Sequence, residues 1–93
     1  MMVSVAKIKL YVPWVHSLKE KRMIVKSICA KVHNKFNASI REVEEHDKHQ
    51  IIVLGIALIA SDTAMADSLH EHIINFIESN QEGEIINIER EII

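Results

Sequence analysis

The spacing of apolar residues changes at Pro13, and this change limits the folds that are open to the chain. Over residues 2–12 two sets of side chains alternate, with Ser4, Ala6, Ile8, Leu10 and Val12 on one face and Val3, Val5, Lys7, Lys9 and Tyr11 on the other. A period of two is typical of a β-strand. Pro13 ends the strand because proline has no amide hydrogen for a ladder. The apolar spacing that follows is that of a helix.

A capping box marks the start of this helix. Ser17 is followed by Glu20 three residues later. The Ser17 hydroxyl is expected to accept from the amide of Glu20, and the Glu20 carboxylate from the amide of Ser17. We therefore expect a helix over Leu18–Lys35. Its buried stripe is predicted to contain Leu18, Val25, Cys29, Val32 and Phe36.

Three more strands and a second helix follow. Residues 38–45 form a polar strand pattern, residues 50–60 a strand that is apolar on both faces, and residues 84–93 a fourth strand. A charged connection, residues 44–49, joins the first two of these.

The second helix is expected over residues 63–80. Ser61 or Asp62 is expected to cap it, and Gly83 permits the turn that follows it. Its inward side chains are predicted to be Met65, Ala66, Leu69, Ile73, Phe76 and Ile77.

The resulting order β-α-β-β-α-β predicts an α+β fold. It matches the ferredoxin-like sandwich, a four-stranded antiparallel sheet with two helices on one face. Right-handed crossovers place the first and third strands in the middle of the sheet and the second and fourth at its edges. With 93 residues, of which 48% are apolar and 26% charged, the chain is expected to form one globular domain, residues 1–93.

The third strand predicts an apolar band on the open face of the sheet. In one register the outward side chains are Ile51, Val53, Ala57 and Ile59, and in the other they are Ile52, Leu54, Ile56, Leu58 and Ala60. Val3 and Val5 would extend the band, and antiparallel pairing would bring Lys7 and Lys9 near Glu89 and Glu91. Contiguous apolar surface of this kind marks an interface, so a twofold homodimer is expected. The alternative is a monomer in which long flanking side chains shield the band.

The chain lacks the residues that several structural and functional features require. The single cysteine, Cys29, excludes an internal disulfide and a thiolate zinc site. It lies on the predicted buried stripe, where a thiol stays protonated and inert. The longest apolar run, residues 51–60, is half the length of a membrane span. We expect a protein of the reducing cytoplasm with no membrane partner and no signal peptide.

No group of residues predicts catalysis. His16 and Ser17 are neighbours in sequence and are poorly placed to act as base and nucleophile, so capping explains Ser17 better. The chain also lacks the glycine-rich turn of a phosphate loop. We expect no catalytic residue, no cofactor and no enzymatic activity.

The histidines do not predict a dedicated metal site. His46, Asp47 and His49 lie in an exposed turn that does not preorganise ligands. On the second helix His70 and His72 point in different directions, and we expect His72 to flank the buried side and His70 to face solvent.

The charge of the chain is segregated along the sequence. Residues 1–48 include ten basic and five acidic residues, whereas residues 49–93 include one basic residue and eight acidic residues. On the first helix a stripe of basic residues, Lys19, Arg22, Lys26 and His33, follows spacings of 3, 4 and 7. Lys21, Lys31 and Lys35 lie elsewhere around the helix. The stripe is the candidate nucleic-acid-binding site, and its alternative is an ordinary solvated helix face.

Short motifs along most of the chain resemble one known family. They are HSLKEKR at residues 16–22, FN at 36–37, EV at 42–43, LG at 54–55, SD at 61–62, FIE at 76–78 and EREI at 89–92. In these motifs the chain resembles the YlxP-like family of small bacterial proteins, a domain of unknown function. The resemblance implies the ferredoxin-like fold and no assigned activity. The family's genes often lie among those for translation initiation and ribosome maturation, which implies a role near the ribosome.

Two functional hypotheses follow. The first is a non-enzymatic protein that binds ribosomal RNA or a ribosome-assembly factor through its basic first helix. The second is a protein–protein interaction module, or homodimer, that associates through its open sheet face and binds no nucleic acid.

Overall fold

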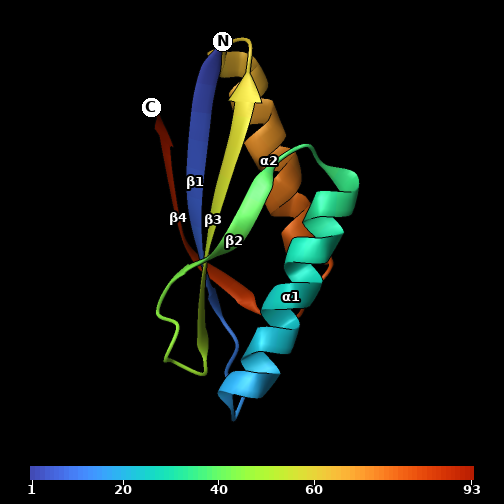
Figure 1. Ribbon diagram of the computed structural model, residues 1–93, viewed down its shortest axis with the longest axis vertical. Helices are drawn as coiled ribbons and strands as arrows, with labels where there is room; N and C mark the ends of the chain where they lie inside the picture. The colour runs from blue at the N-terminus through green and yellow to red at the C-terminus, as the bar shows by residue number, and fades with distance from the viewer.

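The computed structural model describes residues 1–93 and contains four strands and two helices (Figure 1). In chain order these are β1 (Met2–Tyr11), α1 (Leu18–Lys35), β2 (Ser39–Glu44), β3 (Ile51–Ala60), α2 (Thr63–Ser79) and β4 (Glu84–Ile92). The predicted elements are all present, with ends that differ by at most one residue.

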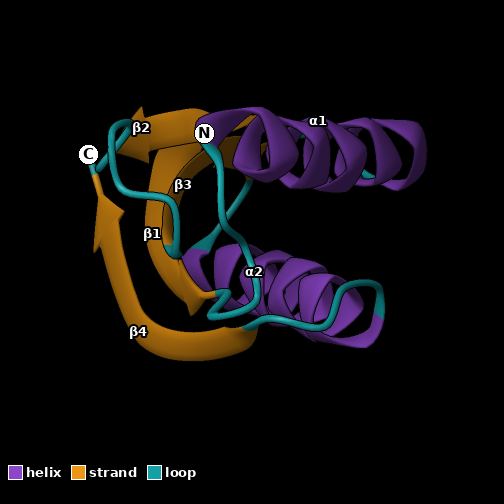
Figure 2. Ribbon diagram, turned by 90° about the horizontal axis from the view of Figure 1, so that it is seen from below, coloured by secondary structure: helices purple, strands orange, loops and turns teal.

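The four strands form one antiparallel sheet in the order β2-β3-β1-β4. Both helices cover the same face of the sheet and leave the other face open (Figure 2). The ferredoxin-like fold is therefore confirmed, with the first and third strands in the middle as predicted. Neither helix is long and apolar enough to cross a lipid bilayer.

The core lies between the sheet and the helices. From the two central strands it takes Ala6, Ile8, Leu10, Ile52, Leu54, Ile56, Leu58 and Ala60. This burial selects one of the two registers left open by the sequence, because the other side chains of β3 must then point away from the helices. The open face accordingly carries Ile51, Val53, Gly55, Ala57 and Ile59 from β3.

Both helix caps form. Ser17 has an extended backbone, and its hydroxyl accepts a hydrogen bond from the amide of Glu20 at 3.1 Å. The Glu20 carboxylate accepts from the amide of His16 at 3.4 Å, not from that of Ser17 as predicted. At the second helix Asp62 is the cap, since its carboxylate accepts from the amide of Met65 at 2.8 Å.

The buried face of α1 differs from the predicted stripe. Its fully buried residues are Lys21, Ile28 and Val32, whereas the other predicted stripe members, Leu18, Val25, Cys29 and Phe36, are only half-buried. The helix is rotated so that a lysine enters the interior. The sequence pattern missed Lys21 because it counted only apolar side chains, although Lys21 lies seven residues before Ile28, on the same side of the helix.

Two predictions for α2 are also wrong. His70 was expected to face solvent, but it is fully buried, and His72 is exposed. Met65 was expected to point inward but is 44% exposed. The buried side chains are Ala66, His70, Ile73 and Ile77, which follow helical spacings of 4, 3 and 4.

Candidate binding surfaces

The basic stripe lies on the exposed side of α1 and consists of Lys19, Arg22, Lys26 and His33. All four side chains are exposed, and none of them forms an ion pair. Lys7, Lys21, Lys48 and Arg90 do have carboxylate partners. The structure therefore leaves the positive charge of the stripe uncompensated by neighbouring acids.

Two further lysines of α1 are engaged with α2 and lie outside the stripe. The Lys31 ammonium donates to the carbonyl of Asn80 at 3.2 Å. The Lys35 ammonium lies 5.0 Å from the centre of the Phe76 ring, within the range of a cation–π contact. These contacts hold one side of α1 to its neighbour and leave the stripe on the other side free.

Lys21 fastens the β2–β3 connection to α1. Its ammonium donates to the carbonyls of Glu45 and Lys48, at 2.7 Å each, and lies 2.9 Å from the carboxylate of Glu42. The side chain is 1% exposed. The two carbonyls accept hydrogen bonds from the ammonium, and the Glu42 carboxylate supplies the opposite charge, although its Oε2 has no hydrogen-bond partner of its own.

The contacts of Lys21 with the β2–β3 connection, which act as a clamp on the hairpin turn, explain part of the HSLKEKR motif in structural terms. Ser17 and Glu20 start the helix, and Lys21 anchors the hairpin turn, where Glu45 adopts a left-handed backbone with a φ of 59°. These three residues of the motif therefore have structural roles. Lys19 and Arg22 of the same motif make no such contacts and remain exposed.

His70 forms a buried polar contact between α2 and β1. Its Nε2 lies 2.9 Å from the hydroxyl of Ser4, and its Nδ1 is buried without a hydrogen-bond partner. Burial lowers the pKa of His70, and the positive charge of Arg90 lowers it further, while Asp67 acts in the opposite direction. The neutral imidazole is therefore the form that fits this site.

Neither Cys29 nor the hairpin histidines form a reactive group. Cys29 is half-buried, and burial raises the pKa of its thiol, as does the nearby charge of Glu42. A raised pKa keeps the thiol protonated and a poor nucleophile. His46 and His49 are exposed in the turn, and no three side chains of the metal-binding types gather in the structure.

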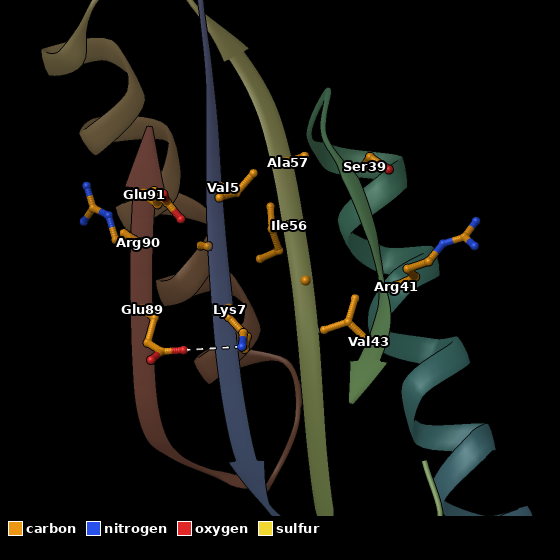
Figure 3. A pocket seen from close by; sticks show the side chains of 12 residues that line it. Val5, Lys7, Ser39, Arg41, Val43, Ile56, Ala57, Glu89, Arg90 and Glu91 are labelled. Carbon is orange, nitrogen blue, oxygen red and sulfur yellow. Dashed lines mark ion pairs between the residues drawn. The ribbon is translucent and has the colours of Figure 1, made fainter. Parts of the chain in front are cut away.

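A shallow groove of about 660 Å³ crosses the open face of the sheet (Figure 3). Small side chains form its floor, with Val5 from β1 and Gly55 and Ala57 from β3. In Figure 3 Arg41 of β2 stands on one side of the groove, and Glu89 and Glu91 of β4 stand on the other. The groove is therefore basic at one edge and acidic at the opposite edge.

Gly55 makes room for the side chain of Val43 at the floor of the groove. A Cβ atom at this position would approach a methyl group of Val43 to 2.7 Å, which is closer than real Cβ atoms come. Val43 lies at an irregularity where β2 shifts register against β3, and its side chain leans over Gly55. The absence of a side chain at position 55 thus admits Val43 and leaves the groove shallow.

Lys7 lies in the groove between two acids. Its ammonium forms ion pairs with Glu44 of β2 and, at 3.6 Å, with Glu89 of β4. The Glu44 carboxylate raises the pKa of Lys7, so the ammonium stays charged. The predicted approach of Lys7 to Glu89 is confirmed, whereas Glu91 pairs in register with Val5.

The comparisons with known proteins identify the family. The family model described as Protein of unknown function (DUF503) matches residues 3–90. A curated relative, the uncharacterized protein YlxP of Bacillus subtilis (strain 168), is 40% identical over 68 residues, which cover 73% of this chain and 74% of the relative. With this match along nearly its whole length and the ferredoxin-like fold, the chain belongs to the DUF503 family, that of YlxP-like proteins of unknown function.

Proposed function

We propose that the protein is a non-enzymatic RNA-binding protein whose basic stripe contacts the phosphate backbone of ribosomal RNA. One observation carries the proposal: three permanent cations, Lys19, Arg22 and Lys26, lie exposed on one helix face without any carboxylate partner. Phosphate contacts by Lys and Arg supply most of the affinity of sequence-independent nucleic-acid binding.

The stripe forms a line of cations along α1 that suits successive phosphates of a nucleic-acid backbone. Lys19, Arg22 and Lys26 are spaced by one turn of α1, so they rise about 5 Å per turn along the helix axis. His33 extends the same line by two turns. The open sheet face carries a single aromatic side chain on its central strands, Tyr11, which does not support base stacking there.

The test replaces Lys19, Arg22 and Lys26 together by glutamate. We expect the triple variant to lose co-sedimentation with ribosomal subunits and binding to purified ribosomal RNA at low salt. It should remain folded, because substitutions at exposed positions cost little. Binding of the unmodified protein should weaken with salt, with a logarithmic slope of about −2.7 for three phosphate contacts.

A matched control separates the stripe from the total charge. Replacing Lys31, Lys35 and Lys48 by glutamate changes the net charge equally and leaves the stripe intact. Because these lysines contact Asn80, Phe76 and Glu45, circular dichroism first checks that the variant is folded. This variant should retain most of the binding. Equal losses in both variants would show that net charge alone drives association, and unchanged binding in the first variant would refute the proposal.

The groove on the open face supports a second function, that of a protein–protein interaction module. Ile59 at one end of this face is 63% exposed, and Val43 beside the groove is 40% exposed. Exposed apolar side chains on a sheet face favour an interface, although Val53 on the same face is buried. Ribosome association that persists in the Lys19, Arg22 and Lys26 variant would favour this second function over the first.

A further inference from the structure

The strand registers arrange the side chains of the open face in rows across the sheet. One row contains Arg41, Gly55, Lys7 and Glu89, and the adjacent row contains Ser39, Ala57, Val5 and Glu91, each in the order from β2 to β4. The residues of a row lie at the same height along the strands. If the strands of a partner sheet run along the strands of this sheet, each row of this sheet therefore faces one row of the partner.

Both rows are asymmetric in charge and in size. Their β4 ends are anionic, and the β2 end of the first row is the cation Arg41. Each row also places a larger side chain of β1 beside a smaller residue of β3. Lys7 stands beside Gly55, and Val5 beside Ala57.

We propose that the open face binds a second copy of this chain, with the twofold axis parallel to the strands. The inference deepens the interaction function and is independent of RNA binding. In this arrangement β2 of one copy faces β4 of the other, and β1 faces β3. Arg41 of each copy meets Glu89 of the other, Lys7 lies over the Val43 side chain that covers Gly55, and Val5 lies over Ala57.

The other axis that keeps the strands aligned is unfavourable. A twofold axis along the rows places β2 on β2 and β4 on β4. Glu89 and Glu91 of one copy would then face the same two acids of the other copy. The small residues Gly55 and Ala57 of β3 would then face each other, and so would the larger Lys7 and Val5 of β1, so the heights of the two faces would not match. Like charges across an interface oppose association, and unfilled hollows forfeit packing contacts.

The charges at the two edges support this choice. Arg41 forms no ion pair within the chain, so it is free to pair with an acid of a second copy. Glu91 has no ion pair either, and in this arrangement it faces Ser39 of the second copy. Lys7 is already neutralised by Glu44 and Glu89. Burying its aliphatic stem against Val43 of the second copy therefore leaves the Lys7 charge paired in the interface.

The size of the face fits a weak but specific dimer. β1 and β3 are each ten residues long. β2 has six residues and β4 nine, so at about 3.4 Å per residue and a strand spacing of about 4.8 Å the four strands offer on the order of 600 Å². Two copies then bury about 1,200 Å², the lower limit of specific interfaces. We expect a dissociation constant in the micromolar range.

The experiment reverses the charges of the first row and measures mass by sedimentation equilibrium from low micromolar to near-millimolar protein. R41E should raise the dissociation constant of the dimer at least about tenfold, because two acidic side chains then face each other at each end of the row. The exchange R41E/E89R should restore the dimer, because an acidic and a basic side chain then face each other again, with their positions reversed. Both positions are exposed, so circular dichroism should show unchanged folding.

Three outcomes would overturn the inference. A monomeric mass for the unmodified protein throughout the concentration range would exclude the second copy as the occupant and leave the face to a different protein. A dimer unaffected by R41E would exclude the pairing of β2 with β4. A dimer lost in R41E and not recovered by the exchange would refute the Arg41–Glu89 contact. The proposal of RNA binding through the stripe is tested with different variants, and none of these three results contradicts it.

Discussion

Lys21 places a charged group in the interior of a small domain. Its ammonium has three oxygen partners, two of them carbonyls of the β2–β3 connection. Removing the lysine would leave those carbonyls and the Glu42 carboxylate without a buried donor. Breaking a buried ion pair in this way costs more than the pair itself contributes, because the remaining charge stays desolvated.

We therefore expect Lys21→Met to lower the free energy of unfolding by about 3 kcal/mol. Denaturant unfolding followed by circular dichroism measures the change. Lys26→Met on the exposed face of the same helix is the control and should change stability by less than about 0.5 kcal/mol. Similar losses in the two variants would contradict the account of Lys21 as a clamp.

His70 makes stability depend on pH. Burial and Arg90 hold its pKa below the ordinary value of 6.5, so the unfolded chain binds a proton more readily than the folded one. The contribution of the neutral imidazole is present above about pH 6.5 and is lost progressively as the pH falls below it. Ser4, which accepts from or donates to Nε2, and Asp67 near Arg90 are the other polar groups that act on the ring.

Replacing His70 by glutamine should reduce the loss of stability between pH 6.5 and the folded-state pKa. Glutamine keeps a polar group near the position of Nε2 and cannot ionise in this range. The free energy of unfolding measured at a series of pH values tests this. His72→Gln alters an exposed neighbour and should leave the pH dependence unchanged; an equal effect of both substitutions would rule out the buried ring as the cause.

At the scale of the elements, the start of α1 depends on one hydroxyl. Ser17 satisfies the amide of Glu20, which has no partner inside the helix. We expect Ser17→Ala to cost about 1 kcal/mol of stability. Thermal or denaturant unfolding measures it, with the exposed mid-helix substitution Ser27→Ala as the control. RNA binding at saturating protein should be unchanged, and a stable Ser17→Ala variant that loses binding would give Ser17 a functional role.

For the whole molecule, the two proposed surfaces belong to different layers. The basic stripe lies on a helix, and the groove lies on the sheet face that the helices leave open (Figures 2 and 3). The R41E variant therefore changes the sheet face and leaves Lys19, Arg22 and Lys26 in place. Reversing the stripe likewise leaves the rows of the sheet intact. This separation makes the RNA-binding and dimerisation tests independent.

Local periodicity was sufficient to predict the elements of this fold. The alternation before Pro13, the Ser17–Glu20 spacing and the apolar run of β3 each depend on residues close in sequence. The order of the elements and the handedness of crossovers then determine the sheet order. The exposed positions of the basic stripe follow from the same helical spacing, and the structure agrees with them.

The burial of Lys21 and His70 and the form of the groove depend on contacts between distant parts of the chain. A pattern of apolar residues assigns Lys21 and His70 to the surface, because their partners are a hairpin turn and β1, far away in sequence. The outward face of β3 is likewise undetermined when both of its faces are apolar. The packing of the helices settles it, since one face must close the core, and the strand registers then bring Arg41, Gly55, Lys7 and Glu89 into one row.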